Sequence, residues 1–272
     1  MTGVSSGIGR AIVERFSGEA GYRVYGTTRQ VVPSVKPSSY FLIQMDPADT
    51  ESVKKAIGEV ARREGRVDLL VNNAGYMVLG SVESIDIDKE LAPMFNVNVL
   101  GYLRTTQAVV PFMRKAGGGT IINISSVQAF EPRALQESYS ATRAAVEALS
   151  LGQNSYLKDY GIKVLVFEPG ATRSNVVHGA RVGSLAVSED QAASHVASFV
   201  EKMGRRIESG EPAESVAEKV FLLSRKVQPD FRTQAGEKEV RRALAVYRDP
   251  TGNRLAGFLR EKYRDFVSGV MR

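Results

Sequence analysis

"MTGVSSGIGRAIVERF", residues 1–16, places Gly3, Gly7 and Gly9 directly before a stretch with the apolar spacing of an amphipathic helix. Glycines allow a tight turn and a close approach of backbone to a ligand, and a helix N-terminus offers amide donors to a pyrophosphate. The alternative is a turn rich in glycine and serine that only caps a helix. The rest of the chain has to decide between the two interpretations.

Downstream of this loop, short β-branched runs alternate with amphipathic helical stretches. Strands are expected at 22–28, 39–46, 67–73, 119–126 and 162–170, and helices at 51–65, 95–117 and 138–161. The near-continuous apolar strands predict a parallel sheet that is covered on both faces. The expected fold class is α/β, a Rossmann-like doubly wound parallel sheet in a single domain over residues 1–272.

The two ends of the chain differ from this regular pattern. A central strand should precede such a glycine loop, yet only Met1 precedes Thr2. We therefore expect a truncated first strand, with a start segment of about 5–10 residues missing; the alternative is that the strand is absent. After Gly170 we expect a loop and helices over about 171–226, a strand at 230–234 and a helical tail over about 237–272.

Composition excludes several classes of function. The chain has 272 residues, no cysteine and only two histidines, which are too few and too isolated for a metal site. The net charge is +6, but Lys and Arg are interspersed with acids, as on solvated helix faces, so nucleic acid is not an expected partner. No apolar run suits a membrane span and no signal peptide precedes the loop. The expected location is the cytoplasm.

Five segments, in this order and at these spacings, resemble the short-chain dehydrogenase/reductase family. They are "TGVSSGIG" (2–9), "NNAG" (72–75), "NISS" (123–126), "YSATR" (139–143) and "PGATRS" (169–174). Each segment is weak evidence alone, but together they identify the chain as a member over about residues 1–175. The resemblance implies an NAD(P)-dependent oxidoreductase that acts on a carbonyl or an alcohol.

The resemblance also implies which residues bind the cofactor. After the second strand the chain offers Arg29 where an acidic residue would bind the ribose of NAD, and a guanidinium suits the 2′-phosphate of NADP. NADP(H) is therefore expected over NAD(H), although Arg29 could instead be a surface residue. The implied set is Gly3, Ser5, Ser6, Gly7, Ile8, Gly9, Arg29, Asp46, Asn73, Ala74, Gly75, Tyr139, Arg143, Pro169, Gly170, Thr172 and Ser174.

The implied catalytic set is Ser126, Tyr139, Arg143 and Asn98. Tyr139 is the expected acid, Ser126 a donor to the substrate oxygen, and Asn98 the residue that holds a water in a proton relay. Tyr139 and Arg143 lie four residues apart and share a helix face, and a cation beside a phenol favours the phenolate. On residue types alone, the pair could be ordinary surface residues, Ser126 a turn cap and Asn98 a helix-bending residue.

Arg143 stands where the family has lysine, and the two residues are not equivalent. Arginine keeps the positive charge, and its fork can hold ribose hydroxyls, but it does not readily pass a proton. We expect an enzyme slowed by Arg143 rather than an inactive one. The alternative function is a catalytically impaired dinucleotide-binding sensor or structural protein.

The expected substrate is a small apolar carbonyl or alcohol, such as a lipophilic ketone or aldehyde. Its pocket is expected between residues 76–82, 127–137 and 173–183, with apolar walls that are equally consistent with packing under loops. The wall residues are Met77, Val78, Phe130, Leu135, Val176 and Val177. By resemblance, helices 95–117 and 138–160 imply a homodimer or homotetramer.

Overall fold

The structure is a computed structural model that describes residues 1–30, 39–173, 181–184, 192–248, 258 and 260–261. Ser174, Val176 and Val177, which the sequence predicts to be near the site, lie outside these ranges, as does most of the predicted helical tail after residue 248. Within these ranges, no helix is long and apolar enough to cross a membrane.

Parallel strands form the centre of the fold, as predicted. β3 (Leu69–Asn72), β5 (Gly119–Ile124), β6 (Ile162–Glu168) and β8 (Arg232–Gln234) pair in that order, and β1 (Tyr25–Thr28) pairs with β2 (Phe41–Gln44). All of these pairs are parallel, so their carboxyl ends lie at one edge of the sheet.

Residues Met1–Gly3 lie between the two groups of strands. The amides of Thr2 and Gly3 donate to Val71 O and Thr27 O, each at 3.0 Å, and Thr27 N donates to Met1 O at 2.9 Å. Met1 N donates to Tyr25 O at 2.9 Å. At the position where the sequence predicts a strand before the glycine loop, these three residues therefore hydrogen-bond to both β1 and β3.

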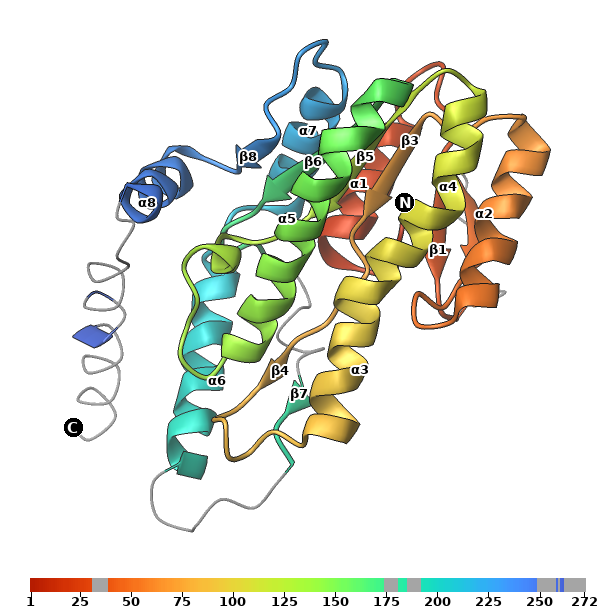
Figure 1. Ribbon diagram of the computed structural model, residues 1–272. Helices are drawn as coiled ribbons and strands as arrows, with labels where there is room; N and C mark the ends of the chain where they lie inside the picture. The colour runs from red at the N-terminus through yellow and green to blue at the C-terminus, as the bar shows by residue number, and fades with distance from the viewer. Residues whose placement is uncertain (31–38, 174–180, 185–191, 249–257, 259, 262–272) are drawn as a thin grey trace.

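Helices cover both faces of the sheet, as Figure 1 shows. α1 (Gly7–Ser17) and α7 (Ala213–Ser224) pack on one face, against residues such as Val71, Ile122 and Phe167. α2 (Thr50–Glu64), α4 (Gly101–Lys115) and α5 (Glu137–Leu157) cover the other face, against residues such as Leu70, Ile121 and Val164. Neighbouring strand residues thus enter opposite cores, which is why these strands read as continuous apolar runs.

Smaller elements surround the carboxyl edge. They are β4 (Val78–Leu79) paired with β7 (Arg181–Val182), the π-helical turns η1 (Ile87–Leu91) and η2 (Asn96–Leu100) on either side of α3 (Ala92–Phe95), the 3-10 turns η3 (Val127–Ala129) and η4 (Lys158–Tyr160), α6 (Ala192–Glu208) and α8 (Glu237–Tyr247).

The helix predicted at 95–117 begins earlier, at Ile87. The side chain of Asp86 accepts hydrogen bonds from the amides of Asp88 and Lys89, so it caps the first turn. The β4–β7 pair was not predicted, because each strand has only two residues and shows no periodicity.

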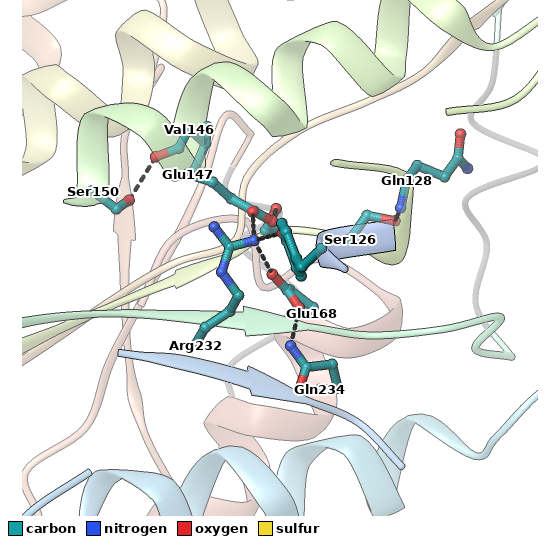
Figure 2. Close-up of polar contacts among 10 residues, drawn as sticks. Ser126, Gln128, Val146, Glu147, Ser150, Glu168, Arg232 and Gln234 are labelled. Carbon is teal, nitrogen blue, oxygen red and sulfur yellow. Dashed lines mark hydrogen bonds and ion pairs between the residues drawn. The ribbon is translucent and has the colours of Figure 1, made fainter. Parts of the chain in front are cut away.

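A buried ionic cluster joins α5, β6 and β8 below the carboxyl edge (Figure 2). Arg232 forms ion pairs with both Glu147 and Glu168, and Gln234 Nε2 donates to Glu168 Oε2 at 2.5 Å. Ser125 Oγ donates to Glu147 Oε1 at 2.6 Å, so the cluster reaches the residue before Ser126. Burial, followed by repulsion from Glu168, raises the pKa of Glu147, and burial likewise raises that of Glu168 against the effect of Gln234 and Arg232.

The cluster predicts a stability that depends on pH. Because the folded state holds a proton on this pair that the unfolded state releases above about pH 5, the free energy of unfolding should fall as the pH rises from 5 to 8. Glu147→Gln keeps the shape of the side chain without the titration, so its denaturation series should show a flatter decline. The exposed Glu208→Gln serves as the matched control. Equal slopes for wild type and Glu147→Gln would contradict the prediction.

Candidate functional site

A cavity of about 940 Å³ opens at the carboxyl edge of the sheet, and it brings most of the predicted site residues together. Of the predicted cofactor set, the residues that line it are Gly3, Ser5, Ser6, Gly7, Ile8, Gly9, Arg29, Asp46, Asn73, Ala74, Gly75, Tyr139, Arg143, Pro169, Gly170 and Thr172. Ser126 lines it as well, whereas Asn98 lies behind Tyr76 and contacts the cavity wall.

The glycine loop packs tightly against the segment after β3. A Cβ atom at Gly9 would lie 2.2 Å from Gly3 O and 2.3 Å from Asn73 Nδ2, and one at Gly3 would lie 2.7 Å from Ala74 Cα. Gly3 also has a φ of +69°, which strains any other residue. Both positions therefore require glycine for local reasons.

The side chain of Thr2 holds the segment after β3 in place through hydrogen bonds. Its Oγ1 accepts hydrogen bonds from the amides of Asn73 at 2.9 Å and Ala74 at 3.0 Å, while Asn73 Nδ2 donates to Gly3 O at 3.0 Å. The two motifs predicted to bind a cofactor thus hold each other in place.

The N-terminus of α1 faces the same cavity. Ser6 is the N-cap residue, but its side chain makes no capping hydrogen bond, and the first turn contains no acidic residue. Free amides at a helix N-terminus attract an anion, here with Gly7 and Ile8 lining the cavity beside them.

Arg29 and Asp46 follow β1 and β2 at one end of the cavity. Asp46 Oδ1 accepts a hydrogen bond from Ala48 N at 2.9 Å, which fixes the turn after the strand. In the part of the chain that the structure describes, the guanidinium of Arg29 has no hydrogen-bond or ion-pair partner.

Tyr139 and Arg143 lie side by side in the first turns of α5. The centre of the guanidinium is 4.8 Å from the centroid of the Tyr139 ring, and both side chains are buried. Arg143 Nη1 donates to Ile124 O at 3.2 Å and to Tyr102 Oη at 3.3 Å, whereas Nε is buried without a partner among the described residues. Tyr139 and Arg143 are therefore not solvent-exposed surface residues of α5.

Arg143 remains a cation in this environment. Burial opposes its charge, but attraction to the phenol oxygens of Tyr139 and Tyr102 outweighs burial, so the pKa of Arg143 is raised above its ordinary value. Burial raises the pKa of Tyr102 as well, in spite of Arg143. A Cβ atom at Gly75 would lie 2.6 Å from Arg143 Nη2, so glycine makes room for the guanidinium.

Ser126 follows β5, where its Oγ accepts a hydrogen bond from Gln128 N at 3.2 Å. Val127 N donates to Pro169 O at 3.2 Å, which ties this turn to the segment after β6. Among the described residues nothing accepts a hydrogen bond from the Ser126 hydroxyl, so its proton is available to the cavity. The predicted turn-capping role and a donor role are therefore compatible.

Asn98 lies in η2, a π-helical turn of the kind that is frequent at functional sites. Its Oδ1 accepts from Tyr76 N at 3.0 Å, and its Nδ2 donates to Tyr76 O at 2.8 Å and to Thr142 Oγ1 at 3.2 Å. The side chain thus holds the backbone beside Gly75 to the first turns of α5.

The predicted apolar wall needs correction. Met77 lines the cavity, but Val78, Phe130 and Leu135 do not. Val78 is fully buried in the core that also contains Met77 and Tyr139, so it packs behind the cavity wall, and Phe130 packs with Val127 and Ala243 of α8.

Other residues complete this end of the cavity, two of them from the segment 127–137 that the sequence predicts to border the pocket and three from α6, which the sequence analysis missed. They are Arg133, Gln136, Met203, Arg206 and Ile207. Burial, followed by repulsion from Arg206 and Arg242, lowers the pKa of Arg133 to about 10. Nothing in the sequence marks Met203, Arg206 and Ile207, because α6 reaches the cavity only through tertiary packing.

The cavity fits a dinucleotide. The close backbone approach at Gly3 and Gly9 and the free amides at the start of α1 border the space that such a group requires, and Arg143 lines the same cavity.

Comparisons with known proteins agree with this geometry. The sequence profile described as "short chain dehydrogenase" matches residues 1–184. The chain is similar to the 3-ketodihydrosphingosine reductase of Bacteroides thetaiotaomicron, with 33% identity over 239 residues that cover 87% of this chain and 86% of that protein. It is also similar to the NADPH-dependent 3-dehydrocapnine reductase of Ornithobacterium rhinotracheale, with 28% identity and 92% of each chain covered.

Among solved structures, a short-chain dehydrogenase from Streptomyces avermitilis superposes with a TM-score of 0.76 at 31% identity, covering 97% of both chains. The extent of the profile match and the identity to these proteins are sufficient to assign the family. The chain belongs to the short-chain dehydrogenase/reductase family and is an oxidoreductase.

Proposed function

We propose that the chain is an NADP(H)-dependent oxidoreductase that interconverts a lipophilic carbonyl compound and its alcohol. The observation that supports this most directly is the buried contact between Tyr139 and Arg143 in the cavity that the glycine loop lines. A bound nicotinamide cofactor supplies the hydride.

In this proposal Tyr139 donates a proton to the oxygen that gains negative charge during reduction, and Ser126 donates a hydrogen bond to the same oxygen. Arg143 lies against the Tyr139 ring and stabilises its phenolate after the transfer. Arg143 cannot return the proton itself, since a guanidinium does not readily deprotonate. Asn98 holds the backbone at Tyr76 and would support a water on the path to solvent.

Residues from the glycine loop to Gly75 would bind the cofactor, with its pyrophosphate at the amides of α1. Arg29 would pair with a 2′-phosphate, which favours NADP(H). Asp46 and Asn73–Gly75 would line the adenosine half, and Pro169, Gly170, Thr172 and Ser174 the nicotinamide half. One relative of similar length is described as NADPH-dependent.

The substrate would lie beyond Tyr139, against Met77, Met203 and Ile207, which form an apolar wall. The relatives named above reduce 3-ketodihydrosphingosine and 3-dehydrocapnine according to their names, which is consistent with a lipophilic ketone. The proposal extends to a cytoplasmic homodimer or homotetramer, whose contacts would use the exposed Leu151 and Tyr156 on α5.

Replacing the arginine tests the catalytic part. Arg143→Lys should raise the rate of NADPH oxidation with a panel of apolar ketones and aldehydes, by up to about 10²–10⁴-fold, because lysine restores the proton relay. Arg62→Lys, on the exposed side of α2, is the control. An unchanged turnover in Arg143→Lys would refute the proposed handicap. NADPH binding without turnover in either protein would favour a dinucleotide-binding sensor.

The cofactor preference is tested separately by fluorescence titration. Arg29→Ala should weaken NADPH binding by about tenfold to a hundredfold while NADH binding stays the same, because only NADPH carries the 2′-phosphate. Lys55→Ala, an exposed cation on α2, should change neither affinity. If Arg29→Ala lost affinity for NADPH and NADH by the same factor, Arg29 would not bind the 2′-phosphate.

A further inference from the structure

Two guanidinium groups line the end of the cavity beyond Tyr139. Arg133 lies in the turn before α5, and Arg206 lies near the end of α6. Neither guanidinium has a hydrogen-bond or ion-pair partner in the described ranges of the chain. The neighbouring Arg205, in contrast, points to the surface and pairs with Glu201.

The charges around these two groups do not balance. Arg242 forms an ion pair with the buried Glu131, and Glu239 is the other carboxylate close to Arg206. Among the described residues, the three arginines therefore share two nearby carboxylates. Their mutual repulsion adds to burial in lowering the pKa of both Arg133 and Arg206. Arg133 is half-buried and Arg206 is exposed, so both guanidinium groups are open to an anion from the cavity, and an anion there would relieve the repulsion between the like charges.

Unpaired polar atoms mark the same place. Gln136 is 2% exposed, lines the cavity and has no partner for its Oε1, while Arg242 Nη2 is also buried without one among the described residues. Gln136 N donates to Arg133 O at 3.1 Å, so the carboxamide and the first guanidinium belong to one turn. Polar atoms that are buried without partners in a native protein call for a ligand or water.

The same end of the cavity also has apolar side chains. Met203 and Ile207 precede and follow Arg206 on α6, and Gln136 Nε2 lies 3.1 Å from Met203 Sδ. A chain that lies along these side chains would bring a charged end to the arginines and a carbonyl to Tyr139. The site therefore suits an amphiphile rather than a purely apolar ketone.

We propose that Arg133 and Arg206 bind an oxyanion of the substrate, such as a carboxylate, phosphate or sulfonate, and so select anionic amphiphilic carbonyl compounds. Guanidinium forks match these groups in both charge and geometry. The inference rests on the proposed function, because it assigns the substrate of that same cavity.

Binding of decanoate and of methyl decanoate to the protein tests the inference without turnover. Isothermal titration of the protein, free and saturated with NADPH, should give a dissociation constant at least about tenfold lower for decanoate. Arg133→Gln and Arg206→Gln should remove this preference, and Arg133→Lys should retain part of it. Arg205→Gln is the matched control, and thermal melts of each variant establish that it is folded.

The outcomes separate the two proposals. Equal binding of acid and ester by the wild type overturns the inference, as does a preference that survives in both glutamine variants. If the variants weaken NADPH and leave the decanoate preference intact, the arginines serve the cofactor pyrophosphate, and the inference also fails. Failure of the proposed function has a different signature, namely no NADPH binding or no reduction of a panel that includes oxo carboxylic acids.

Discussion

The backbone of Met1–Gly3 joins the two parts of the sheet. Its hydrogen bonds to Thr27 on one side and Val71 on the other keep β1 and β3 in parallel register. Because β1 pairs with β2 and β3 with β5, this connection brings the carboxyl ends of both groups of parallel strands to one edge. The same three residues lead directly into the glycine loop, so the connection also sets where the loop meets Asn73 and Ala74.

Near that edge, polar side chains hold the turn that carries Ser126 and the backbone at Tyr76 in place. Ser125 is bound by Glu147 from α5, and Glu147 and Glu168 share Arg232 from β8. The turn that carries Ser126 therefore rests on a cluster assembled from three elements far apart in the chain (Figure 2). Asn98 acts similarly on the other side, where it holds the backbone at Tyr76. These contacts connect the stability of the fold to the geometry of the cavity.

The sequence predicted those parts of the site that consist of short contiguous motifs. The glycine loop, the NNAG segment and the Tyr139–Arg143 pair were predicted because each is a short motif, and the parallel fold brings strand ends together. The ionic cluster and Arg206 were not predicted, because they depend on which face of α6 and which end of β8 pack inward. The apolar wall was partly wrong for the same reason, since Val78 fits both a cavity and a core.

Four arginines show how structural and functional cations differ in this protein: Arg143 is buried, Arg133 and Arg232 are half-buried, and Arg206 is exposed. Arg232 is balanced by two carboxylates and needs no ligand. Arg143 is held by a carbonyl and a phenol, keeps one N–H unpaired, and lies against the ring of Tyr139. Arg133 and Arg206 have no partner among the described residues, although burial and repulsion both act on them. The arginine with carboxylate partners, Arg232, lies outside the cavity lining, whereas Arg133 and Arg206 line it, so in our proposal a ligand provides the interaction that the described residues do not.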